Sequence, residues 1–127
     1  MKKAIDLGFR ILIAVILLQT LRYKFTAHPD SVYIFNKIGL EPYGRIAIGI
    51  LELISAILIL IPKTIWLGAS LTVGIISGAI IMHITIIGIE VNNDGGTLFF
   101  MALLIFTLAL FVLWKNRKNI PIIGKRL

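Results

Sequence analysis

Two ionisable side chains stand inside stretches of sequence that are otherwise apolar. Glu52 lies near the middle of one stretch, residues 44–61, and His83 lies in the next, residues 65–89. Such groups can hold the polar end of a ligand, relay a proton, or tie neighbouring helices together. A carboxylate at the centre of a bilayer costs about 2.5–3.5 kcal/mol, so Glu52 must face other helices, be paired, or be protonated.

Glu52 and His83 are at similar depths if their stretches form antiparallel helices. At a rise of 1.5 Å per residue, Glu52 is about 12 Å from residue 44, and His83 is about 9 Å from residue 89. Gln19, at the end of an earlier apolar stretch, reaches a similar level. The spacing therefore predicts that side chains from three helices meet in one layer.

Cations gather near the same end of these helices. Arg22 and Lys24 follow Gln19, and Arg45 stands two turns before Glu52 on the same helix face. The predicted ligand-binding residues are Glu52, His83, Arg22, Lys24, Arg45 and Gln19. They could hold an anionic or quinone-like headgroup, transfer a proton, or serve only as contacts between helices, and the sequence leaves these three alternatives open.

Several chemistries are disfavoured by composition. The chain has no cysteine, which excludes disulfides, thiolate nucleophiles and dithiol redox chemistry. Glu52 and His83 are two ligands, fewer than a zinc or iron site requires, so we expect no metal. Catalytic residues cannot be assigned, because no set of nucleophile, base and orienting group can be placed. We expect a protein without catalytic activity of its own, although an enzyme stays an alternative.

The positioning elements follow from hydropathy. The 127 residues are 58% hydrophobic and only 15% charged, whereas soluble domains are about 25% charged. Apolar runs long enough to cross a bilayer cover residues 4–21, 44–61, 65–89 and 97–114. Short turns between them favour antiparallel neighbours. The predicted fold is all-α, a transmembrane antiparallel four-helix bundle forming one domain, residues 1–127.

Three local patterns refine this arrangement. Asp6 and Arg10 have the spacing of an ion pair on one helix face. Pro29 and Gly39 bracket a segment with a helical apolar period, which predicts a short helix on the membrane surface or an ordinary structured loop. Gly74 and Gly78 form a small-residue stripe, which allows close packing inside the bundle or a homo-oligomer.

The distribution of basic residues predicts the orientation. Of the 13 Lys and Arg residues, nine fall on one side, namely Lys2, Lys3, Arg10, Lys63, Lys115, Arg117, Lys118, Lys125 and Arg126. The other four are Arg22, Lys24, Lys37 and Arg45. The positive-inside rule then places both termini in the cytoplasm. The net charge of +7 suits anionic lipid headgroups, and without a recognition motif we expect no nucleic-acid binding.

At this point the sequence resembles the DoxX family of bacterial four-span membrane proteins. The stretches that carry the resemblance are LRYKF at 21–25, GILELI at 49–54 with Pro62-Lys63 after it, LGA at 67–69, and SGAxxxH at 77–83. The glutamate after a glycine and the histidine after Gly-Ala, Glu52 and His83, resemble family hallmarks.

The resemblance implies a multi-pass protein of the bacterial cytoplasmic membrane, associated with a membrane redox system and its partner subunits. It suggests a quinone as the small molecule, with no covalent cofactor. Thiol relay is excluded by the missing cysteines. Our leading hypothesis is an accessory protein that binds a lipophilic molecule near Glu52 and His83. The alternatives are a structural or assembly protein without a ligand, and a small proton-coupled transporter or enzyme.

Overall fold

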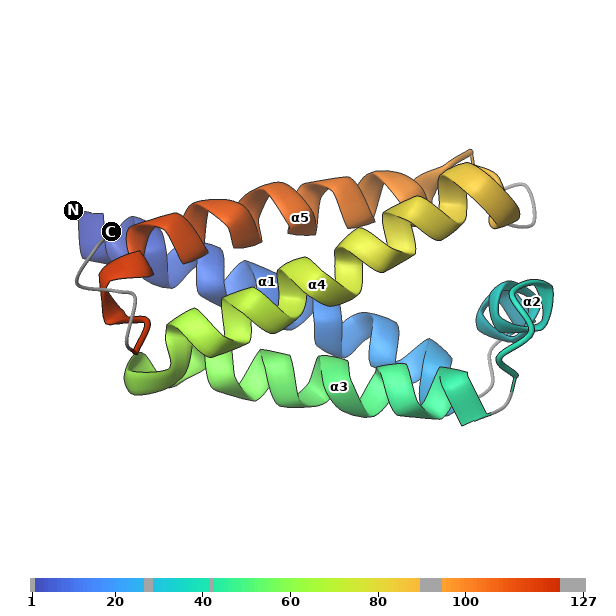
Figure 1. Ribbon diagram of the computed structural model, residues 1–127, viewed down its shortest axis with the longest axis horizontal. Coiled ribbons are helices and arrows are strands. Elements are labelled where there is room, and N and C mark those ends of the chain that lie inside the picture. Colours follow the sequence, from blue (N-terminus) through green and yellow to red (C-terminus); the bar gives the residue numbers. More distant parts are fainter. Residues whose placement is uncertain (1, 27–28, 42, 90–94, 122–127) are drawn as a thin grey trace.

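The computed structural model describes residues 2–26, 29–41, 43–89 and 95–121, and over these ranges it is an all-α bundle (Figure 1). Its α-helices are α1 (Lys2–Phe25), α2 (Pro29–Lys37), α3 (Tyr43–Leu60), α4 (Ile65–Met82) and α5 (Thr97–Lys115). Short helical turns cover η1 (Pro62–Thr64), η2 (His83–Ile87) and η3 (Arg117–Asn119). The predicted fold class is confirmed.

Four of the helical segments are long and apolar enough to cross a membrane. Helix α3 has 18 residues, which corresponds to about 27 Å of helix, close to the thickness of a hydrocarbon core. The outward faces of these helices are apolar, with Val15, Ile84 and Phe100 more than half exposed. Since such surfaces are stable against lipid, the chain is an integral membrane protein.

The third predicted span changes its geometry before it ends. Helix α4 stops at Met82, and His83–Ile87 continues as one π-helical turn, η2. The Gly88 N–H closes this turn by donating to the His83 carbonyl oxygen at 2.8 Å. Single π turns are rare and occur often at functional sites. Gly88 then ends the helix with φ +90° and ψ +165°, a conformation that essentially only glycine adopts.

The helices separate toward one end of the bundle (Figure 1). At the opposite end, called the closed end, the rings of Phe9 in α1 and Phe111 in α5 meet edge to face, with centroids 5.1 Å apart. From there α1 crosses toward α3, and α4 crosses from α3 toward α5 (Figure 1). The pairs α1–α3 and α4–α5 therefore diverge at the second end, called the cavity end, and α2 lies across it (Figure 1).

Arg10 joins α1 to the end of α3 at the closed end. Its buried guanidinium donates from Nη1 to the carbonyl oxygens of Ile59 at 3.2 Å and Leu60 at 3.4 Å. These carbonyls end α3, where they lack helical partners and carry the negative end of the helix dipole. The predicted pair with Asp6 is confirmed: Nε lies 3.1 Å from Oδ2, but without hydrogen-bond alignment, so the contact is ionic.

The two glycine patterns of α4 have different environments. A Cβ on Gly68 would lie 2.4 Å from the Ile59 backbone nitrogen, so a glycine is needed where α4 crosses α3. Gly74 and Gly78 are exposed, and nothing lies within 4 Å of a Cβ built on either. They make no close contact inside this bundle, so the expectation that this small-residue stripe packs closely against another helix of the same chain was wrong. A homo-oligomer through them stays a prediction.

Candidate functional site

A cavity of about 250 Å³ lies at the cavity end, between the diverging helix pairs and beneath α2. Most of its lining is apolar, including Ile76, Met82, Met101 and Ile105. A cavity of about 150 Å³ holds benzene, and drug-sized ligands occupy about 300–1,000 Å³. The space therefore suits one substituted ring or a molecule of similar bulk.

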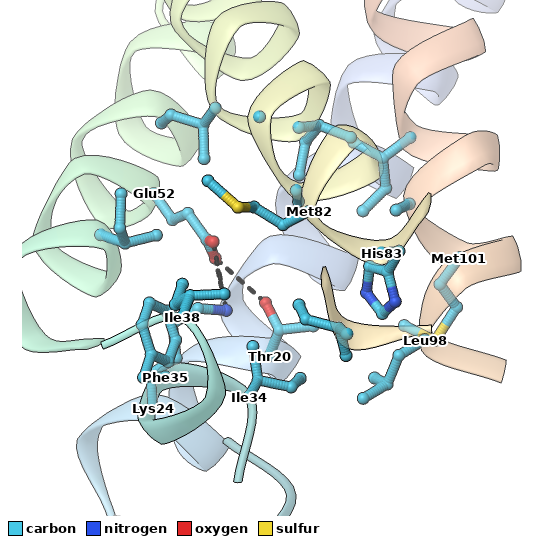
Figure 2. A pocket seen from close by; sticks show the side chains of 18 of the residues that line it. Thr20, Lys24, Ile34, Phe35, Ile38, Glu52, Met82, His83, Leu98 and Met101 are labelled. Atoms are coloured by element: carbon cyan, nitrogen blue, oxygen red, sulfur yellow. Dashed lines mark hydrogen bonds and ion pairs between the residues drawn. The ribbon is translucent and has the colours of Figure 1, made fainter. Parts of the chain in front are cut away.

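The polar wall of the cavity consists of an ion pair and a hydroxyl (Figure 2). Glu52 in α3 is only 4% exposed, and its Oε1 lies 3.1 Å from Lys24 Nζ in α1. The Thr20 hydroxyl lies 3.2 Å from Glu52 Oε2 and also 2.8 Å from the Leu17 carbonyl oxygen. The pair neutralises the buried carboxylate, as a charge inside a membrane bundle requires.

His83 stands at the start of η2 and lines the same cavity (Figure 2). It is 5% exposed, and its ring packs edge to face on Phe99 in α5, with centroids 5.6 Å apart. Its Nδ1 lies 3.0 Å from the Gly88 carbonyl oxygen. Both members of the predicted Glu52–His83 layer thus face one space, although a ligand-binding role for them stays a prediction.

Helix α2 covers the cavity. Ile34, Phe35 and Ile38 contribute to the lining, and Phe35 is buried. The Lys37 ammonium lies 3.3 Å from the Ile87 carbonyl oxygen, which ties α2 to η2. The segment is a helix rather than an ordinary loop. Its apolar period, visible in the sequence, turns this face toward the end of the bundle.

The other predicted site residues lie elsewhere. Gln19 and Arg22 are exposed on α1 and are not part of the cavity lining. Each residue turns an α-helix by about 100°, so a face that carries Thr20 and Lys24 excludes both. Arg45 is buried, but its Nε is 2.8 Å from Glu41 Oε1, and its Nη1 donates to the Lys24 carbonyl oxygen. It joins α1 to α3 instead of facing the cavity.

Thr20 is the polar residue that sequence reasoning missed. Leu17, Thr20 and Lys24 have the spacing i, i+3 and i+7, which places them on one helix face. That spacing was the available signal, because Leu17 is buried and Lys24 carries the charge that Glu52 requires. Among the described residues, no three His, Asp or Glu side chains gather as a metal site would need. His28 lies outside the described residues.

The fold and the site define a small four-span membrane protein with a helix-capped apolar cavity at one end. The chain belongs to the DoxX-like family, whose profile matches residues 9–112. The matched region contains Thr20, Lys24, Glu52 and His83, so the whole polar lining of the cavity lies within it. No curated protein and no solved structure matches the chain.

Proposed function

We propose that this protein is a non-catalytic accessory subunit that binds a lipophilic ring compound of the quinone class in the cavity beneath α2. One observation carries the proposal: an apolar space of about 250 Å³ has polar side chains from α1, α3 and η2 in its walls. Binding sites for small molecules typically combine an apolar lining with a few polar groups that orient the ligand.

The residues present fit a quinone headgroup. A quinone carbonyl oxygen needs a donor, and the Lys24 ammonium has three N–H groups, of which Glu52 does not require all. The Thr20 hydroxyl contacts the same Glu52 carboxylate. A bound quinone would supply electron-transfer chemistry, while this chain would hold the ring, orient its oxygens and exclude water.

The geometry supports binding over a purely structural role. Glu52 and Lys24 join two helices, as structural polar contacts do. His83, however, bonds through Nδ1 to Gly88 of its own segment and so does not use that hydrogen bond to tie helices together. Transport has less support, because α1, α3 and α5 are continuous α-helices, whereas transporter sites typically use interrupted ones.

The proposal predicts that Glu52→Gln weakens the binding of menadione, a naphthoquinone without a long tail. A glutamine is nearly isosteric but uncharged, so it holds the Lys24 ammonium less firmly, and we expect a loss of about tenfold in affinity. Titration of the purified protein in mild detergent measures this loss. Mass spectrometry of small molecules that co-purify with the wild type would identify the natural ligand.

Glu41→Gln is the matched control, because Glu41 pairs with Arg45 and is not part of the cavity lining. It should bind menadione like the wild type. Absence of menadione binding by the wild type, or unchanged affinity in Glu52→Gln, would contradict the proposed function.

The proposal includes both termini in the cytoplasm of a bacterial inner membrane, so that the cavity end faces outward. Because the chain has no cysteine, single introduced cysteines report the orientation cleanly. Tyr43 is 84% exposed near the cavity end, and Lys118 is exposed beyond α5. An impermeant maleimide should label Tyr43→Cys in intact cells and Lys118→Cys only after lysis; the opposite pattern would reverse the orientation.

The proposed assembly has two kinds of partner. One is a redox subunit of the same membrane, which would exchange the bound ring compound. The other is a second copy of this chain, packed through Gly74 and Gly78 of α4, of which Gly78 also borders the cavity. Small residues of this kind let membrane helices approach closely.

A further inference from the structure

We propose that the cavity selects ring compounds that carry a hydroxyl group, and that this hydroxyl donates to Nε2 of His83. This inference rests on the proposed function, because it specifies the ligand of the same cavity. The proposed ligand class is the phenols and hydroquinones, and we expect a hydroquinone to bind more tightly than the corresponding quinone.

The first step is the tautomer of His83. Nδ1 lies 3.0 Å from the Gly88 carbonyl oxygen. A carbonyl oxygen only accepts hydrogen bonds, so Nδ1 carries the proton. A neutral imidazole has one N–H, and Nε2 is therefore an acceptor.

The second step is what holds this tautomer. Gly88 is bound to His83 twice: its N–H donates to the His83 carbonyl oxygen at 2.8 Å, and its own carbonyl accepts from the His83 ring. The backbone of Gly88 has φ +90° and ψ +165°. Only a glycine takes this conformation without strain, so the π turn and the glycine together fix the acceptor.

The third step is that Nε2 is left without a partner. No other residue in the described part of the chain hydrogen-bonds to the ring, although His83 is 5% exposed and lines the cavity. Among the described residues, only Arg10 has a fully buried side-chain nitrogen or oxygen without a partner, so His83 Nε2 is accessible and a donor on a ligand can reach it from the cavity. Lys24, the cation in the described cavity lining, is engaged with Glu52.

These steps determine the polarity of the ligand. Phenolic hydroxyls donate, whereas quinone carbonyls only accept and would set two acceptors against each other at Nε2. The second oxygen of a hydroquinone can accept from Lys24 or donate to Glu52 across the cavity. A ring with a hydroxyl at one end and an oxygen at the other can hydrogen-bond to His83 and to the Lys24–Glu52 pair at the same time.

The test uses para-cresol and its methyl ether, which share a ring and differ in the donor. Binding is measured to the full-length protein in detergent at one fixed, mildly alkaline pH. Wild type should bind para-cresol about tenfold more tightly than the ether, the ratio that one good hydrogen bond supplies. His83→Phe keeps an aromatic ring, removes the acceptor, and should bind both compounds equally.

A second variant tests the inference in case His83→Phe does not fold. Gly88→Ala strains the φ +90° conformation that fixes the tautomer of His83, so it should reduce the preference for para-cresol over its methyl ether. Nitrogen NMR of histidine-labelled wild type, with His28→Asn to assign the signals, should show His83 protonated at Nδ1.

The outcomes separate the two proposals. Menadione binding without a preference for para-cresol, or an Nε2–H tautomer, would overturn this inference and leave the proposed function standing. Failure of menadione and of both probe rings to bind the wild type would overturn both.

Discussion

Replacing Lys24 by methionine should lower the free energy of unfolding by about 3–5 kcal/mol, because it leaves a buried carboxylate without its partner. Glu52 is 4% exposed, and its described contacts come from Lys24 and Thr20. The hydroxyl alone cannot neutralise the charge. The loss is measured by reversible unfolding in detergent micelles.

The double variant Lys24→Met with Glu52→Leu separates the missing partner from general damage. Both charges are then gone, and apolar side chains of similar size fill the space, so stability should return to within about 1–2 kcal/mol of the wild type. This double variant should also lose menadione binding. A double variant as unstable as Lys24→Met would show that the ion pair is not the cause.

Arg22→Met is the matched control for this experiment. Arg22 is on the same helix, two residues from Lys24, and its side chain is exposed. Exposed substitutions of this kind typically change stability by less than about 0.5 kcal/mol. A loss of stability as large as that of Lys24→Met would show that the effect is not specific to the partner of Glu52.

Gly68→Ala should destabilise the bundle by at least about 1–3 kcal/mol, the usual cost of overpacking. The added Cβ would lie 2.4 Å from the Ile59 nitrogen and 2.8 Å from its Cα. Both are backbone atoms, so no side-chain rotation relieves the clash and α3 and α4 must move apart. The measurement is the midpoint of thermal unfolding together with the helical content before unfolding.

Gly8→Ala is the control for an added methyl group. Gly8 lies within α1, and nothing is within 4 Å of a Cβ built there. Alanine is a better helix former than glycine by about 1 kcal/mol, so this variant should be equal to the wild type or slightly more stable. If both glycine variants behave alike, the close crossing at Gly68 is not a real constraint.

The span arrangement was predictable because hydrophobic length is a local property of the sequence. The common depth of Glu52 and His83 followed from the rise per residue and antiparallel order alone. The orientation of side chains around α1 was harder to predict, although the spacing of Leu17, Thr20 and Lys24 was one signal for the face that lines the cavity. Gln19 is followed by Thr20, and apolar residues surround most of this helix, so composition does not reveal which face is buried.

The remaining features depend on how the helices cross. The cavity exists because α1 and α4 change neighbours along the bundle (Figure 1), and no single segment encodes that angle. For the same reason, the Asp6–Arg10 spacing predicted a pair, but not that Arg10 would bind the Ile59 carbonyl oxygen. Hydropathy does not record the π turn that begins at His83, because apolar residues continue through it.

The cavity lining does not extend past Leu17 in α1 and Ile105 in α5, and the next core residues toward the closed end, Ile13 and Ala109, are fully buried. A passage to the closed end would have to open this core packing and also break the bonds from Arg10 to the carbonyl oxygens that end α3. Because α2 contributes Ile34, Phe35 and Ile38 to the lining, we expect substitutions in α2 to alter the rates at which the proposed ligand binds and dissociates together. A cavity that does not continue to the closed end supports the proposed binding role over movement of a compound from one membrane face to the other.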